Sequence, residues 1–342
     1  MSRTVTFMAA IVALVVSSQA AVGETRVGLM APLTGPFALL GQQMEAGAEA
    51  AAKQTDVTLI TADDRCEANG GASAARRLLD EGVTIVVGGL CSEAMEAALP
   101  VLTEAGVPMI SAGVRADRFT DKRSKEGWLF WRVAPRDDAE RTAVSQLLVP
   151  LWRNDLFAIV DDGTIYGREI AETFRLAAEV NGLKPVFVDT FRPQSENQVA
   201  LVSRLVRSGA GKVFVGGDRD DIAIIARDAA AAGSELVIAG GELLRAASAN
   251  QLQAGVLMVA VPEAPEIGEG YAVSAFAAVE IAAAASKHSS QRSGDLTETL
   301  ENGTFETALG LVKFDDKGDL SINPYRLHRF DGEKFVLVEE DQ

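Results

Sequence analysis

The side chains that could do chemistry in this 342-residue chain are few, and their spacing argues against catalysis. The chain has two histidines and two cysteines, which are too few for most zinc sites and for any iron–sulfur cluster. The sequence contains no Walker loop, no nucleophile-elbow serine, no pair of histidines at helical spacing and no dinucleotide-binding glycine fingerprint. We therefore expect no catalytic residue, no metal site and no cofactor.

The net charge of the chain argues against two classes of partner, nucleic acids and membrane surfaces. Aspartate and glutamate outnumber lysine and arginine by 48 to 32, which gives a formal net charge of -16. Such a charge repels phosphate backbones and anionic lipid headgroups, so we expect neither a nucleic acid nor a membrane surface as partner. The 48% hydrophobic content is typical of a globular protein, and the sequence has no apolar run of about 18 residues that could span a bilayer.

The N-terminus has the pattern of a secretory signal. Arg3 precedes an uninterrupted apolar stretch over residues 7–16, and small residues follow as far as Ala20. We predict a signal peptide over residues 1–23, cleaved after Ala20 or Gly23, and a mature protein located in the periplasm. A buried N-terminal helix is the alternative interpretation.

Export favours a disulfide between the two cysteines, because thiols tend to pair in the oxidising periplasm when the geometry allows. Cys66 and Cys91 are then a candidate disulfide. The competing interpretation is a reactive nucleophile at Cys91. It is disfavoured because His288 and His328 both lie in polar C-terminal segments that the sequence does not tie to a thiol.

Short β-branched runs alternate with alanine-rich amphipathic stretches from residue 25 onward, which is the pattern of βα units that build a parallel sheet. The first series predicts strands 26–30, 57–62, 84–87 and 107–110 and helices 39–53, 71–81 and 92–103. The second series predicts strands 156–160, 185–189, 212–215 and 236–239 and helices 166–180, 198–207 and 220–232. The fold class is therefore α/β.

The remaining segments determine how two lobes are assembled. The aromatic-rich stretch 128–135 predicts a crossing strand that ends at Pro135. A long alanine-rich helix over 268–287 has no strand partner nearby, so we expect it to pack back on the first series. Short strands and turns over 310–338 suit a further crossing and an edge hairpin. We predict two Rossmann-like lobes with parallel sheets, one of residues 24–134 plus 263–323 and one of residues 135–262 plus 324–342.

Loops at the carboxyl ends of the predicted strands are the candidate binding surface, because open α/β sheets bind ligands there. In the first lobe these loops are 32–36, 88–92 and 111–115. In the second lobe they are 161–167, 216–218 and 240–242. We expect the two sets to face each other across a cleft.

Four features in this order make the resemblance to a known family specific. They are Val27 to Pro36, the pair formed by Asp63 to Cys66 and Gly89 to Ser92, the stretch Asp162 to Gly167 with its Tyr-Gly, and Phe314 to Asp319. Over essentially the whole mature length, the chain resembles the leucine/isoleucine/valine-binding family of ABC-transporter solute receptors. The resemblance implies the type I periplasmic-binding fold, with two lobes joined by three crossovers that close over a ligand.

The resemblance also implies a ligand site. It places Leu90 and Ser92 at the carboxylate of an amino acid, with the backbone of Gly113 nearby and Glu242 at the ammonium. A hydroxyl and free N–H groups at a helix start suit an anion, and a buried carboxylate suits a cation. The alternative interpretations are that Ser92 only caps the following helix and that Glu242 is a solvated loop acid.

Departures from the family pattern bear on the ligand. Arg115 stands where close relatives have a small hydroxyl residue, and Leu40 and Asp218 stand where aromatic side chains are common, whereas Tyr166 and Tyr271 match retained aromatics. We expect Arg115 to fork onto a carboxylate and Asp218 to face the ligand side chain. A polar or cationic amino acid, or a related amide, should then bind more tightly than leucine.

A competing interpretation pairs Arg115 with Asp117 or Asp218 instead of a ligand. The function implied by the resemblance is capture of an amino acid or related zwitterion for an ABC permease in the inner membrane, by a monomer without enzymatic activity. Two other functions remain open from the residues. One is a sensory receptor of the same fold, and the other is a secreted α/β enzyme with Glu242 or Asp218 as general base.

Overall fold

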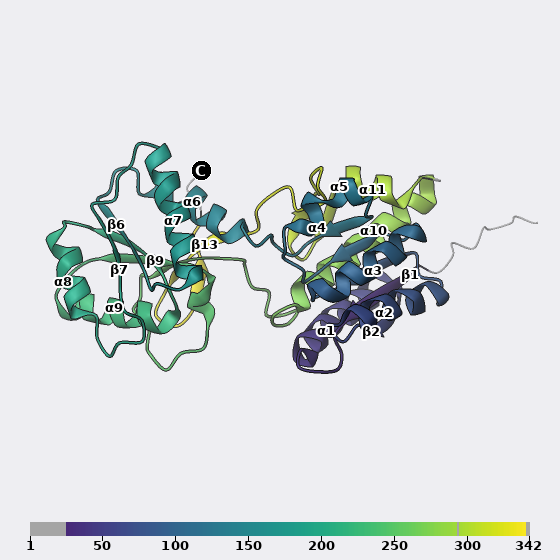
Figure 1. The fold of residues 1–342 in the computed structure, drawn as a ribbon, viewed down its shortest axis with the longest axis horizontal. Helices are drawn as coiled ribbons and strands as arrows, with labels where there is room; N and C mark the ends of the chain where they lie inside the picture. The colour runs from purple at the N-terminus through teal and green to yellow at the C-terminus, as the bar shows by residue number, and fades with distance from the viewer. Residues whose placement is uncertain (1–24, 293, 340–342) are drawn as a thin grey trace, which may run out of the picture.

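The computed structural model describes residues 25–292 and 294–339, which form two α/β bodies (Figure 1). We call the body around the five-stranded sheet the first lobe and the body around the seven-stranded sheet the second lobe. This architecture confirms the predicted α/β class. The predicted signal peptide lies outside the described residues.

The first lobe contains a parallel sheet with strand order β2-β1-β3-β4-β5. Alternate residues of β1 serve opposite faces: Val27 and Leu29 enter the core beneath one helix layer, and Met30 enters the core beneath the other. The five strands are β1 (Arg26–Ala31), β2 (Thr58–Asp63), β3 (Ile85–Gly88), β4 (Met109–Ser111) and β5 (Phe130–Arg132).

Helices cover both faces of this sheet. The layer on one face is formed by α1 (Ala38–Thr55) and α10 (Ala272–Arg292), and the layer on the other by α2 (Ala68–Asp80) and α3 (Ser92–Glu104). Shorter elements complete the lobe: α4 (Arg118–Asp121), α5 (Arg123–Glu126), α11 (Leu296–Asn302) and the ribbon of β11 (Phe305–Thr307) with β12 (Gly310–Val312).

The second lobe is built around a sheet with strand order β14-β13-β10-β9-β8-β6-β7. Strands β13 and β14 form an antiparallel hairpin at its edge, as predicted for the C-terminal tail. The strands are β6 (Phe157–Asp161), β7 (Phe187–Thr190), β8 (Lys212–Gly216), β9 (Val237–Gly240), β10 (Leu257–Ala260), β13 (Arg326–Phe330) and β14 (Phe335–Leu337). The helices are α6 (Ala139–Leu151), α7 (Ile165–Val180), α8 (Val199–Arg207), α9 (Arg219–Ala231) and the 3₁₀ helix η1 (Glu242–Arg245).

The chain passes between the sheets after β5, after β10 and before β13, and Figure 1 shows these connecting segments between the two bodies. The lobe boundaries near residues 134, 262 and 323 remain predictions. The long helix after the second crossing packs against α1, as expected. It begins at Ala272 rather than at residue 268, because Gly268 and Gly270 have φ angles of 147° and 57° that an α-helix does not contain.

The cysteine pair is bonded. Cys66 and Cys91 form a disulfide with their Cα atoms 5.1 Å apart. Cys66 follows β2, and Cys91 immediately precedes α3, so the bond ties two strand-end segments of the first lobe together. Across the described residues, the helices lack the combination of length and apolar character that a membrane crossing needs.

Candidate functional site

The loop between β3 and α3, where the ligand carboxylate is predicted to bind, packs tightly against the backbone of β1. Gly88 and Gly89 have φ angles of 100° and 72°, and a Cβ on Gly88 would lie 2.3 Å from the carbonyl oxygen of Met30. Leu90 then packs on the first-lobe core. Ser92 is the first residue of α3, and Cys91 occupies the position before it. Ser92 is therefore not the N-cap that the alternative interpretation proposed.

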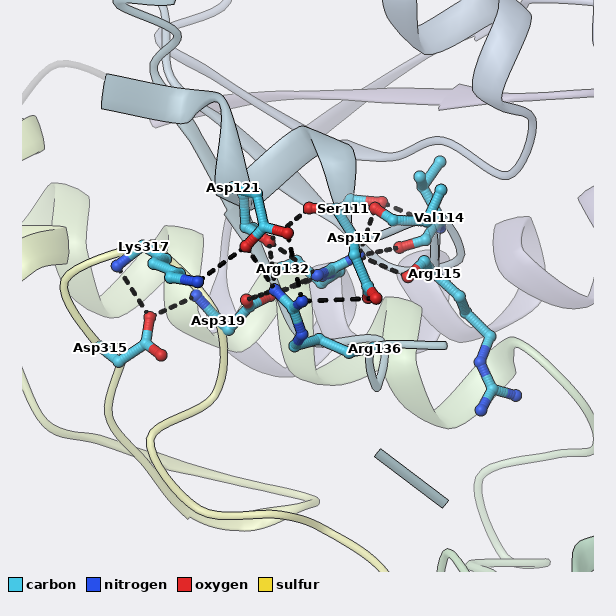
Figure 2. Close-up of polar contacts among 12 residues, drawn as sticks. Ser111, Val114, Arg115, Asp117, Asp121, Arg132, Arg136, Asp315, Lys317 and Asp319 are labelled. Atoms are coloured by element: carbon cyan, nitrogen blue, oxygen red, sulfur yellow. Dashed lines mark hydrogen bonds and ion pairs between the residues drawn. The ribbon is translucent and has the colours of Figure 1, made fainter. Parts of the chain in front are cut away.

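The loop after β4 carries the other first-lobe candidates. The Gly113 N–H donates to the carbonyl of Gly89 at 3.1 Å, so this donor is already engaged. Arg132 holds the next stretch, because its Nη1 donates to the carbonyls of Val114 (3.3 Å), Arg115 (2.7 Å) and Ala116 (3.0 Å). Figure 2 shows the Arg115 side chain leading away from this cluster. The backbone of Arg115 is thus fixed while its guanidinium is free to reach elsewhere.

The Arg115 guanidinium contacts residues of the second lobe. Its Nη2 donates to the Tyr325 hydroxyl at 2.6 Å, and its Nη1 lies 3.8 Å from Oε2 of Glu242. Tyr325 in turn donates to that same Oε2 at 2.9 Å. The competing prediction, a pair with Asp117 or Asp218, is not what the structure contains. Asp117 lies 3.4 Å from Arg136, and Asp218 accepts a hydrogen bond from the backbone N–H of the third residue after it.

Glu140 is a residue of this site that the sequence analysis missed. Its Oε1 accepts from the Tyr166 hydroxyl and from the Glu242 N–H, both at 2.7 Å. A Cβ on Gly241 would lie 2.3 Å from both Oε1 of Glu140 and the Tyr166 hydroxyl oxygen, so this junction leaves no room for a larger residue. Nothing local in the sequence reveals that this acid near the start of α6 has a partner about one hundred positions away.

Burial sets the protonation of these groups. Burial raises the pKa of the Glu140 carboxyl, opposed by its hydrogen bonds from Glu242 and Tyr166. Burial and then the charge of Glu242 raise the pKa of the Tyr325 phenol, and burial likewise raises that of Tyr166. Both phenols therefore keep their protons at neutral pH and act as hydrogen-bond donors to carboxylates.

A cavity of about 610 Å³ lies along the connecting segments. Arg115 and Tyr271 line it from the first lobe, and Glu242 lines it from the second. Three prolines near the crossings between the lobes also lie in its wall: Pro135, Pro262 and Pro324. Opposite charges and an aromatic ring thus meet in one cavity of a size suited to a small molecule.

The other predicted ligand residues lie outside the lining of this cavity. Leu90, Ser92 and Gly113 belong to the first lobe. Tyr166 is linked to Glu242 through Glu140, whose Oε1 accepts from the Tyr166 hydroxyl and from the Glu242 N–H. Asp218 caps α9, with its Oδ1 accepting from the N–H of Asp221 at 2.9 Å. The premise that Asp218 is free to face a ligand side chain is therefore wrong in this structure. Leu40 is partly buried in the first turn of α1.

The described part of the chain holds no cluster of three or more histidine, cysteine, aspartate or glutamate side chains arranged for a metal ion. What the arrangement can do is bind. A guanidinium and a carboxylate, held on different lobes, present complementary partners to a ligand with both an anionic and a cationic end.

Known proteins resemble this chain in sequence and in fold. A family model described as "Periplasmic binding protein" matches residues 24–261. A curated protein of Brucella melitensis, "Leu/Ile/Val-binding protein homolog 3", is 27% identical over 94% of this chain and 95% of its own length. The structure of an ABC-transporter protein from Rhodospirillum rubrum superposes with a TM-score of 0.76 at 17% identity, over 92% of this chain and 100% of that one. An ABC-transporter substrate-binding protein from Desulfitobacterium hafniense, in complex with Leu, gives 0.63 at 21% identity over the same shares.

Proposed function

Because the chain belongs to the periplasmic binding protein family, whose model matches residues 24–261, we propose that it captures an α-amino acid between its lobes for an ABC transporter. The family is one of binding proteins, so the secreted-enzyme alternative loses its support. The names of the relatives point to leucine, isoleucine and valine as the first ligands to test.

The observation that carries the proposal is the pair of opposite charges in one cavity. Arg115 and Glu242 come from different lobes and both line the 610 Å³ space at the crossings. An amino acid whose carboxylate meets Arg115 and whose ammonium meets Glu242 would bridge the lobes. Such a ligand favours the closed form, because it is held by groups of both lobes at once.

Closure extends the site to residues that the open cavity does not reach. We place the ligand carboxylate against the Ser92 hydroxyl at the start of α3, where free N–H groups favour an anion. We assign Leu90 and the backbone of Gly113 to the first-lobe wall of the closed site and Tyr166 to its second-lobe wall. Tyr271 lies next to α10 and supplies an apolar wall.

The surface available to the ligand side chain differs from the one that the sequence predicted. Asp218 is engaged as a helix cap, so it no longer supports a polar side chain. The cavity wall combines the apolar side chains of Val133, Val261 and Leu309 with the carboxylates of Glu263 and Glu269. The expectation that a polar or cationic amino acid binds more tightly than leucine now rests on Arg115 and on these two acids.

The partner and compartment follow from the same proposal. A receptor of this family delivers its ligand to a permease in the inner membrane, so we place the mature chain in the periplasm as a monomer. The sensory alternative uses the same cavity. Uptake of labelled ligand by cells that carry or lack the gene separates the two roles.

A binding panel tests the proposal. The mature chain is mixed with each of the twenty amino acids and followed by thermal unfolding, and the best ligands are measured by calorimetry. A ligand at 100 times its dissociation constant should add about 2.7 kcal/mol to the stability. Glu242→Gln should abolish most of this gain, and Glu172→Gln, which changes an exposed acid on α7, should not. Failure of all twenty to raise the midpoint would refute the proposal, and mass analysis after incubation should return the ligand unchanged.

A further inference from the structure

Tyr325 joins the two charged residues of the cavity, although no sequence motif drew attention to it. It directly follows the cavity-lining Pro324, and its hydroxyl accepts from Arg115 at 2.6 Å and donates to Glu242 at 2.9 Å. We call Arg115, Tyr325 and Glu242 the clasp. Two of its members belong to the second lobe and one to the first, so the clasp spans the cleft.

The three members of the clasp differ in how far their side chains are exposed and able to move. Tyr325 is 2% exposed and its ring packs in the second-lobe core, so its hydroxyl has a fixed position. The side chains of Arg115 and Glu242 are 34% and 28% exposed, so solvent and small molecules reach both. Tyr325 is therefore the fixed element, and the two charged groups can exchange partners around it.

Glu242 has more partners of opposite charge than Arg115 has. Glu242 also accepts from Arg245 at 3.2 Å through its other oxygen, so it keeps one cation when Arg115 leaves. Among the described residues, Arg115 has an ion pair with Glu242 alone. Its Nε is buried without a hydrogen-bond partner, and its Nη1 lies too far from Glu242 for a hydrogen bond. The guanidinium thus has unused donors.

We propose that the clasp works by exchange of counter-ions, with Tyr325 as a residue that determines specificity for zwitterions. This rests on the proposed function. The ligand ammonium replaces Arg115 at Glu242, the ligand carboxylate replaces Glu242 at Arg115, and the Tyr325 hydroxyl keeps both side chains oriented during the exchange. A half-buried charge left without a partner is costly, so a ligand with only one charged end should bind more weakly than a zwitterion.

Because Glu242 has a second cationic partner and Arg115 has no second acid among the described residues, the exchange predicts an order of ligand affinities. A ligand with an ammonium but no carboxylate displaces Arg115 and leaves it without an acid. A ligand with a carboxylate but no ammonium draws Arg115 away, and Glu242 retains Arg245. Binding strength should therefore fall in the order amino acid, deaminated acid, decarboxylated amine.

The test compares three compounds with the same isobutyl side chain by calorimetry on the mature chain. They are L-leucine, 4-methylpentanoic acid, which lacks the ammonium, and 3-methylbutylamine, which lacks the carboxylate. We expect the acid to bind about 100-fold more weakly than leucine and the amine more weakly still. If another amino acid of the panel binds more tightly, its own acid and amine take the place of this pair.

Variants separate the exchange from a structural role. Arg115→Gln removes the cation that an amine would leave without an acidic partner. The ratio of leucine to amine affinity should therefore fall at least about tenfold. Tyr325→Phe keeps the ring and removes the hydroxyl, and it should lower the ratio of leucine to acid affinity by about tenfold. Arg118→Gln makes the same charge change on α4, away from the cavity, and should leave both ratios unchanged.

The outcomes are distinguishable. If leucine binds but the amine equals the acid, or if both ratios stay constant in Arg115→Gln and Tyr325→Phe, the exchange is overturned and the proposed function stands. If the wild-type chain binds none of the twenty amino acids, the proposed function fails and the exchange fails with it. A loss of stability alone would weaken all three compounds equally and leave the ratios unchanged.

Discussion

Replacing Asp319 with alanine should destabilise the protein more than any change to an exposed ion pair. Asp319 lies in the turn before the last crossing and pairs with Arg132, whose side chain is 0% exposed. The Arg132 Nε donates to Oδ1 at 2.7 Å, and Arg136 donates to Oδ2 at 2.9 Å (Figure 2). The carboxylate therefore compensates a fully buried cation.

The magnitude follows from this burial. Removing one partner of a buried pair leaves an uncompensated charge, which costs about 3–5 kcal/mol. In urea titrations monitored by circular dichroism, an m-value of about 3 kcal/mol per M turns this loss into a midpoint that is about 1 M lower or more. Asp319→Asn retains an oxygen for the guanidinium and should lose less than Asp319→Ala.

The matched control is Glu96→Ala. Glu96 pairs with Arg118 at 2.7 Å, but the two side chains are 50% and 42% exposed, so the pair is screened by solvent. Its loss should cost no more than about 1 kcal/mol. A midpoint for Asp319→Ala that matches the Glu96→Ala control would show that Arg132 does not depend on Asp319, and the reasoning would be refuted.

Three further predictions concern the disulfide, closure and pH. Thiol titration of the denatured, non-reduced protein should detect neither Cys66 nor Cys91, and two free thiols would contradict the bond. X-ray scattering should give a smaller radius of gyration with saturating leucine than without it, and equal values would contradict closure of the lobes. Burial, with a smaller contribution from the charge of Asp63, raises the pKa of Asp64 from 3.8 to about 6. Native Asp64 then keeps a proton that the unfolded chain loses, so stability should fall as pH rises from about 4 to about 6. Asp64→Asn should be more stable than wild type at pH 7 in thermal unfolding, and parallel pH profiles of the two proteins would count against this account.

The sequence predicted the regular elements well where burial on both faces leaves an apolar run. The strand expected at 26–30 is β1 (Arg26–Ala31), and the helix expected at 92–103 is α3 (Ser92–Glu104). Shorter elements were missed. The helix α11 (Leu296–Asn302) has too few turns to show a period. The strand β10 (Leu257–Ala260) was missed although Gly255 and Pro262 bound its apolar run.

The site was less predictable, because its residues meet through contacts distant in sequence. Arg115 and Tyr325 are 210 positions apart, and no local pattern could pair them. Asp218 illustrates the opposite error. An acid two residues after a strand and just before a helix is a common N-cap, and this local role is the one the structure contains. A residue's place in a family pattern does not reveal such competing local bonds.

The position of α10 has a consequence for the order in which the chain can fold. The core beneath α1 is completed by α10, which is synthesised after all strands of the second sheet up to β10. An emerging chain therefore cannot finish its N-terminal lobe until most of the polypeptide exists, and such distant pairing slows folding. This delay would suit the export that we propose, because a chain that folds late remains extended enough to be threaded through a translocation channel.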